Sequence, residues 1–180
     1  TRRSSDLPLA KAWGTDVGCE VASLGVQVHG GMGYIEETGA AQHLRDARIA
    51  PIYEGTNGIQ GNDLVGRKLG RDGGAVARAF IAEMRTIDAE LARAAGDDVA
   101  AIRRHLSAGL DALAAATDGI VTTLASDLPR ALAGAAPYLR MFGIVAGGWL
   151  LAKGALAAQR ALAERPRNAR FLQAKLMTAR

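Results

Sequence analysis

The chain has 180 residues and one cysteine, Cys19, so an internal disulfide bond is excluded and a reducing, cytoplasmic setting is expected. Its net charge of +4 is carried by basic residues interleaved with Asp and Glu, a distribution that argues against a nucleic-acid-binding protein. Aromatic residues make up only 4% of the chain while Ala and Leu are abundant, which predicts an all-α fold.

The first predicted helix covers residues 7–29, where apolar side chains recur at helical spacing. Asp6 can cap this helix and Pro8 suits its first turn, so residues 1–5 are expected to fray. The glycine-rich run 30–33 predicts the end of the helix, because glycine tolerates positive φ and leaves backbone N–H groups bare.

Two more helices are predicted before residue 70. Thr38 can cap the first of them, and Pro51 ends it because the residue before a proline avoids the helical region. Residues 51–55 then form a tight loop, after which Thr56 or Asn57 caps a third helix. Its apolar face is expected to include Ile59, Leu64, Val65 and Leu69.

The segment 70–74 (GRDGG) is the predicted linker between two helical regions, 1–69 and 70–180. Long Ala-rich amphipathic segments follow it. Short loops between such helices predict an up-and-down helical bundle, extended by a second helical bundle. The later helices are expected at residues 75–95, 98–127 and 130–164, with Pro129 near the start of the last, and from 167 onwards after a break at Pro166.

The most apolar stretch, 141–158, is interrupted by Lys153. Its uninterrupted part, 141–152, is shorter than the roughly 20 residues that a membrane helix needs. We therefore expect a buried helix and no transmembrane segment, with Trp13 and Trp149 in the core. The N-terminus shows no apolar stretch of the kind found in signal peptides.

Two motifs carry residue types suited to chemistry. Glu54 lies in a loop before a helix and is followed by glycine, which fits a catalytic carboxylate or a capping or solvated side chain. Residues 27–31 (QVHGG) fit either phosphate contacts or an ordinary glycine C-cap. His29 and His43 are expected at the helix surface or in packing, and no Cys/His spacing predicts a metal site.

The run 52–56 (IYEGT), preceded by 45–49 (RDARI) and by the glycine motif 27–31, closely resembles the C-terminal helical domain of the acyl-CoA dehydrogenases. The resemblance implies an FAD-dependent oxidoreductase that acts on CH–CH groups and desaturates acyl thioesters. It implies that Glu54 removes the α-proton while the β-hydride passes to the flavin. The backbone N–H of Glu54, with a ribityl hydroxyl of FAD, would stabilise the enolate oxygen.

The same resemblance implies the remaining site residues and partners. Tyr53 and Gly55 would contact the acyl-CoA substrate, and Gly55 would let it lie close against the chain. FAD contacts would come from Gln27, Gly30, Gly31, Thr56, Asn57 and Gly58. Gly58 stands where better-known members of the family often carry glutamine or another residue with a side chain, so only a backbone contact is expected there. An electron-transfer flavoprotein would be the partner, in a homo-oligomer. Arg45, Asp46 and Arg48 are expected to form ion pairs that brace the Glu54 loop.

The specific motifs cover residues 9–69, whereas 75–180 resembles the helical extension of a longer bacterial branch. That branch includes enzymes acting on 3-methylthiopropanoyl-CoA and on fatty acyl-CoAs. The chain is therefore expected to be a C-terminal fragment that is inactive alone, does not hold FAD tightly and associates through uncovered apolar faces. The alternative hypothesis is a non-catalytic helical assembly module that keeps the motif as scaffold.

Overall fold

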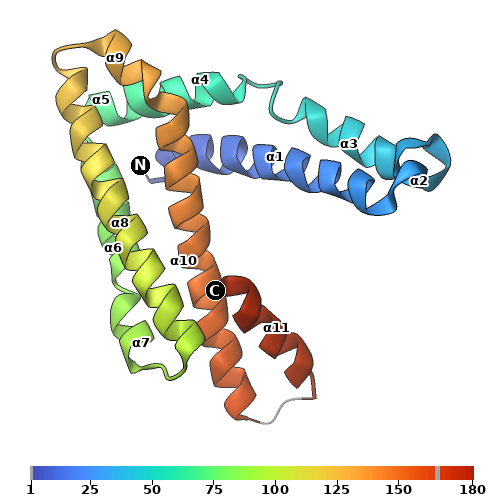
Figure 1. The fold of residues 1–180 in the computed structure, drawn as a ribbon. Coiled ribbons are helices and arrows are strands. Elements are labelled where there is room, and N and C mark those ends of the chain that lie inside the picture. The colour runs from blue at the N-terminus through green and yellow to red at the C-terminus, as the bar shows by residue number, and fades with distance from the viewer. Residues whose placement is uncertain (1, 165–166) are drawn as a thin grey trace. The chain divides into compact units, whose positions relative to one another are not determined.

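The computed structural model describes residues 2–164 and 167–180, with side chains from residue 7 onwards. These residues form helices and turns without a strand, which confirms the predicted all-α fold (Figure 1). They divide into two compact units. Unit 1 comprises Thr1–Gly73 with Ile120–Gly143, and unit 2 comprises Gly74–Gly119 with Ile144–Arg180. The predicted boundary between 1–69 and 70–180 stays a prediction.

Helix α1 (Arg2–His29) is longer than predicted. The expectation of a frayed start capped by Asp6 is wrong, because the helix already begins at Arg2. Pro8 therefore lies inside the helix, where its ring is fully buried. One proline removes a single helical N–H, and burial of its ring compensates. The predicted end is confirmed, since the helix stops at His29 and Gly30 takes a left-handed φ of 62°.

The short helices α2 (Gly31–Tyr34) and η1 (Glu36–Thr38) turn the chain back, and α3 (Ala40–Ile49) packs along α1 (Figure 1). The predicted cap at Thr38 is wrong, because the residue before α3 is Gly39 and it makes no side-chain cap. The Thr38 hydroxyl instead donates to the carbonyl of Met32 at 2.6 Å. Helix α3 ends before Pro51, as predicted.

Helix α4 (Asn57–Asn62) is capped by Thr56, whose hydroxyl accepts from the N–H of Ile59. It continues as the wider π-helix η2 (Asp63–Leu69) and as α5 (Gly70–Asp72). Leu64, Val65 and Leu69 are buried as predicted, whereas Ile59 is exposed. The segment 70–74 is thus helical for three residues, and only its last two, glycines with left-handed φ, form the turn.

Unit 1 is completed by the end of α8 (Asp97–Leu124), by α9 (Leu128–Ala133) and by the start of α10 (Ala135–Ala163). The predicted single helix over 130–164 is wrong, because the chain breaks between α9 and α10 at Gly134. Pro129 lies in the first turn of α9, where Asp127 accepts from the N–H of Arg130 at 3.0 Å. An Asp cap followed by a proline favours a new helix start there.

Unit 2 is built from α6 (Ala75–Arg85), α7 (Asp88–Arg93), most of α8, the later part of α10 and α11 (Ala169–Ala179). The predicted continuous helix over 75–95 is wrong, since α6 ends before Thr86, whose hydroxyl donates to the carbonyl of Glu83. Phe80 meets the buried Trp149 edge to face, with ring centroids 5.9 Å apart. The expected break at Pro166 falls outside the described residues.

Helix α10 is long and apolar enough, by length and composition alone, to cross a membrane. However, 44% of its most apolar window is buried inside the protein, and the core helix of a soluble protein passes the same test. Its buried residues include Leu139 and Phe142 in unit 1 and Trp149 and Leu156 in unit 2. Packing of this kind is what the sequence predicts for a buried helix.

Candidate functional site

The chain between α3 and α4 forms a compact turn around Glu54. The carbonyl of Ile49 accepts from the N–H groups of Ile52 and Tyr53, and the carbonyl of Pro51 accepts from the N–H of Asn57. Among the described residues, Glu54 is the one non-glycine with a positive φ, 54°. This left-handed conformation costs an L-residue about 1–2 kcal/mol, so the surroundings of the turn must hold it.

Gly55 meets two requirements of the turn that other residues cannot. Its φ is 85°, a conformation that side chains rarely adopt. A Cβ at this position would also lie 3.2 Å from Nε2 of Gln60, closer than side chains normally pack. Glycine therefore lets the backbone lie against the start of α4.

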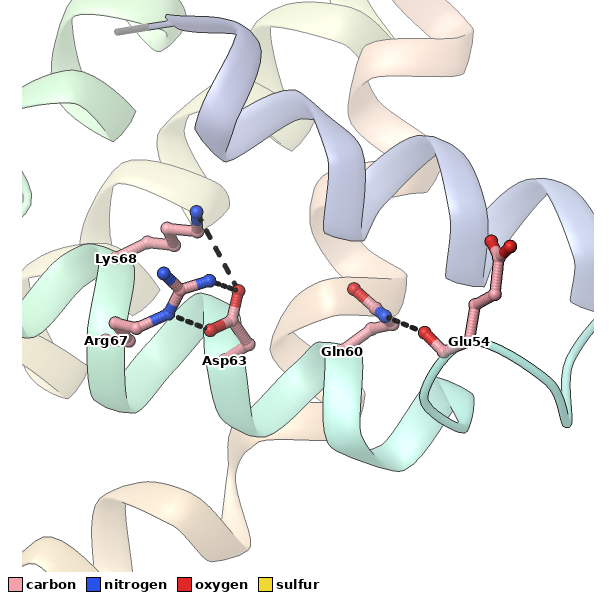
Figure 2. A network of polar contacts seen from close by, with 5 residues as sticks. All are labelled: Glu54, Gln60, Asp63, Arg67 and Lys68. Atoms are coloured by element: carbon pink, nitrogen blue, oxygen red, sulfur yellow. Dashed lines mark hydrogen bonds and ion pairs between the residues drawn. The ribbon is translucent and has the colours of Figure 1, made fainter.

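Gln60 reaches back from α4 to the turn, as Figure 2 shows. Its Nε2 donates to the carbonyl of Glu54 at 3.2 Å and lies 3.5 Å from the carbonyl of Gly55. The Gln60 amide thus fixes the carbonyl of Glu54, and with it the peptide unit between Glu54 and Gly55. Sequence reasoning missed Gln60, although its position six residues after Glu54, on the helix that Thr56 caps, was a usable signal.

Helix α1 holds the turn from the other side, through its own Lys11 and through hydrogen bonds to Asn57, the first residue of α4. Nζ of Lys11 donates to the carbonyl of Gly55 at 2.8 Å and to Oδ1 of Asn57 at 2.8 Å. Nδ2 of Asn57 donates in turn to the carbonyl of Ala12 at 3.0 Å and to Oδ1 of Asp16 at 2.7 Å. We call Lys11, Asn57 and Gln60 the clasp. The side chain of Asn57, which was predicted to contact FAD, is occupied by these hydrogen bonds to α1.

The donor side of the turn faces solvent. Glu54, Gly55 and Thr56 are exposed, and in the described chain their backbone N–H groups have no acceptor. The Glu54 side chain likewise makes no hydrogen bond or ion pair with any described residue, and Tyr53 is 52% exposed. Because Thr56 caps α4, the capping alternative for Glu54 is wrong. Its carboxylate and its own N–H are both available to a ligand.

The second motif lies at the far end of α1. Gln27 is exposed on the last turn, Gly30 ends the helix and Gly31 begins α2. His29 contacts the carbonyl of Gly25 one turn back at 2.9 Å, as expected of a helix-surface histidine. From Lys11 to Gln27 the helix rises about 24 Å at 1.5 Å per residue, so one chain does not bring the two motifs together.

The predicted bracing by Arg45, Asp46 and Arg48 is wrong. Nη2 of Arg45 pairs with Oε2 of Glu36 at 2.9 Å, and Asp46 and Arg48 form no ion pair within the described ranges. Arg45 and Arg48 are three residues apart in α3 and share a face of the helix, whereas Asp46 lies on a different face and so does not pair with either arginine. The loop is held by the clasp instead.

One turn beyond Gln60, Asp63 and Arg67 form a two-pronged ion pair that involves Nε and Nη2 of the arginine (Figure 2). The hydrogen bond to Asp63 raises the pKa of the Arg67 guanidinium. Nζ of the buried Lys68 lies 3.9 Å from the same carboxylate. All three side chains belong to η2, so these contacts stabilise the element that continues the helix of Gln60 and do not join it to another one. Within the described ranges no group of His, Cys, Asp and Glu could hold a metal.

The structure thus defines an all-α protein that presents an unpartnered carboxylate on a constrained turn between two helices. Residues 1–69 match the family model for the acyl-CoA dehydrogenase C-terminal domain, and residues 79–180 match the acetyl-CoA dehydrogenase C-terminal-like model. The chain belongs to the acyl-CoA dehydrogenase family, which confirms the resemblance seen in its motifs.

Two relatives are similar over most of the chain. The 3-methylmercaptopropionyl-CoA dehydrogenase of Ruegeria pomeroyi is 50% identical over 173 residues, 96% of this chain and 29% of that protein. The broad-specificity linear acyl-CoA dehydrogenase FadE5 of Mycobacterium tuberculosis is 31% identical over 163 residues, 87% of this chain and 26% of that protein. The chain therefore spans less than a third of the length of these relatives.

A shorter match is to the human mitochondrial short-chain specific acyl-CoA dehydrogenase. It is 44% identical over 52 residues, which are 29% of this chain and 13% of that protein. The identity to the bacterial relatives extends much further along the chain, in keeping with the expected extension.

Proposed function

We propose that this chain is the C-terminal part of a flavin-dependent acyl-CoA dehydrogenase, in which Glu54 is the base that removes the α-proton of an acyl-CoA thioester. The observation that carries the proposal is the state of Glu54. Its carboxylate is unpartnered in the described chain, its N–H is unbonded, and the clasp holds it in a left-handed conformation. Family membership supports the reaction class.

The chemistry requires both groups that this residue offers. The α-proton of a thioester is too weakly acidic for a carboxylate in water, so the site must stabilise the negative charge that develops on the thioester oxygen. The unbonded N–H of Glu54 is a donor of the required kind, and its carboxylate is the acceptor for the proton. Tyr53 and Gly55, exposed beside Glu54, would contact the substrate.

FAD would supply the acceptor for the β-hydride. The exposed amide of Gln27 and the backbone N–H of Gly31 suit its phosphate oxygens, and the unbonded N–H of Thr56 suits another oxygen of the cofactor. The N–H of Gly30 already donates to the carbonyl of Gln27 at 3.1 Å, so Gly30 would contribute by letting the cofactor approach the backbone closely. The backbone of Gly58, exposed in the first turn of α4, is a further donor. Asn57 contributes through the turn that it holds.

The separation of about 24 Å along α1 between Lys11 and Gln27 favours a homo-oligomer, in which the glycine motif serves a cofactor of a neighbouring subunit. An acyl-CoA thioester is the substrate class that the names of the two relatives support. An electron-transfer flavoprotein as acceptor and a cytoplasmic location belong to the same proposal. The intact Glu54 turn argues against a purely structural assembly module.

The test is Glu54→Gln in the full-length enzyme, with single-turnover reduction of the flavin by acyl-CoA as the assay. Glutamine keeps the shape but cannot accept the proton, so the rate should fall about 10²–10⁴-fold while FAD remains bound. For Glu54→Asp the rate should fall less, because a base remains, although its carboxylate lies about one methylene short of the position that the Glu54 carboxylate takes. Near wild-type reduction by Glu54→Gln would place the base elsewhere and defeat the proposal.

A further inference from the structure

We propose that Lys11 is a positioning residue for this reaction, and that it acts by holding the Glu54 turn in its reactive backbone conformation. The inference rests on the proposed function of Glu54. Lys11 lies on a different helix from the turn and 44 residues before Gly55, to whose carbonyl it donates at 2.8 Å. It is therefore a tertiary link between α1 and the turn.

The hydrogen bonds to the turn determine where its donors point. In a trans peptide unit the C=O and the following N–H point in opposite directions. Gln60 binds the carbonyl of Glu54, so the N–H of Gly55 points away from α4. Lys11 binds the carbonyl of Gly55, so the N–H of Thr56 points away from α1. Both N–H groups, like that of Glu54, are left unbonded by the described chain.

Because Lys11 is charged, its hydrogen bond to the turn is stronger than that of Gln60. Hydrogen bonds from a charged donor are roughly twice as strong as neutral ones. Among the described residues Nζ of Lys11 has no carboxylate partner, and its acceptors are the carbonyl of Gly55 and Oδ1 of Asn57. The ammonium thus fixes the peptide unit between Gly55 and Thr56, and with it the backbone that follows Glu54.

Asn57 aims Lys11 at the turn. Its Nδ2 donates to the backbone of α1 at Ala12 and to the side chain of Asp16, which fixes the orientation of the amide. Its Oδ1 is then presented to Nζ of Lys11 at 2.8 Å. A left-handed Glu54 is conformationally unfavourable, so loss of Lys11 would let the turn relax and would move the carboxylate. A misplacement of about 1 Å can cost about 10²-fold in rate.

The experiment compares Lys11→Met, Lys11→Arg and wild type in the full-length holoenzyme. Single-turnover flavin reduction by acyl-CoA gives a rate constant and an amplitude, the fraction of flavin that is reduced. For Lys11→Met we expect the rate constant to fall about 10–100-fold. The amplitude, the FAD content and the Kd for acyl-CoA should change less than about threefold, because the site is present but loosely held. For Lys11→Arg the rate constant should fall less, since arginine keeps a charged donor.

Lys175→Met is the matched control, because it removes one charge from the exposed surface of α11 in unit 2. It should leave the rate constant unchanged. A merely structural role for Lys11 would lower the FAD content or the amplitude and leave the rate constant of the remaining enzyme intact, which would overturn the inference. So would a Lys11→Arg variant as slow as Lys11→Met.

The outcome also separates this inference from the proposed function. If Glu54→Gln is slow while Lys11→Met reduces its flavin at the wild-type rate, the positioning role fails and Glu54 keeps its assignment. If Glu54→Gln is itself as fast as wild type, the proposed function fails, and the positioning role fails with it. Slow reduction by both, with full amplitude in Lys11→Met, supports both claims.

Discussion

Trp13 packs directly against Gly143, at a point where no larger residue fits. A Cβ added to Gly143 would lie 2.7 Å from both Cβ and Cδ1 of Trp13. Both residues belong to unit 1, where this contact joins α1, the helix of Lys11, to the start of α10. The contact sets how closely the two helices can approach, and it supports the helix from which the clasp extends.

Gly143→Ala should therefore destabilise the chain by about 1–3 kcal/mol, as overpacking of a well-filled core does. Trp13 cannot yield easily, because the clash involves atoms next to its backbone. Urea unfolding followed by circular dichroism measures the change. The matched control is Gly148→Ala in the same helix, where a new Cβ meets nothing within 4 Å. That variant should be neutral or more stable, by up to about 1 kcal/mol.

Gly55→Ala should distort the Glu54 turn. Alanine is strained at a φ of 85°, and its Cβ would press on Nε2 of Gln60 at 3.2 Å. We expect flavin reduction in the full-length enzyme to slow by about tenfold or more, because small displacements of a catalytic group are costly. Gly96→Ala introduces similar strain, at a φ of 108°, in unit 2. It should lower stability without slowing the reaction, and equal slowing by both variants would contradict the argument.

Local signals in the sequence predicted three of the helix boundaries in the first seventy residues, whereas the expected caps at Asp6 and Thr38 were wrong. Gly30 ends α1, Pro51 follows the end of α3 and Thr56 caps α4, because each effect depends on the residue itself and its immediate neighbours. The Glu54 motif was found differently, through the resemblance of residues 45–56 to the acyl-CoA dehydrogenases. The family match confirms the resemblance that the motif indicated.

The contact of Lys11 within the clasp could not be predicted from local signals. Lys11 and the turn are 44 residues apart in sequence, and nothing in the local pattern around Lys11 indicates its partner. The same limit explains the wrong assignment of Arg45, whose partner is Glu36 in η1. The breaks at Thr86 and Gly134 were missed because an Ala-rich apolar pattern continues across each of them.

The ion pair between Asp88 and Arg103 in unit 2 should make stability depend on pH. Nε and Nη2 of Arg103 donate to the carboxylate at 2.7 and 2.9 Å, and this hydrogen bonding lowers the pKa of Asp88 below its ordinary value of 3.8. A depressed carboxyl pKa stabilises the folded state above the unfolded value, and the stabilisation is lost as pH falls through the folded value.

The urea midpoint of wild type should therefore exceed that of Asp88→Asn at pH 7 by a small margin, because both side chains are about half exposed. The margin should shrink as the pH falls below 3.8. It should also shrink in about 1 M salt at pH 7, where exposed charges are screened within about 3 Å. A difference that is unchanged at pH 2 would mean that packing, and not the charge of Asp88, is responsible.

The isolated 180-residue chain should self-associate through apolar residues exposed on α1 and the elements that follow it. Val21, Leu24 and Val28 are 60%, 56% and 85% exposed, and Tyr34 is 83% exposed. Apolar side chains gathered in this way are typical of surfaces that other protein covers. Sedimentation velocity over a range of concentrations should show species larger than a monomer. Leu24→Glu should shift the distribution towards monomer without lowering helix content, whereas Leu128→Glu, at an exposed leucine on α9, should not. A clean monomer at high concentration would show that these side chains tolerate water and do not drive assembly.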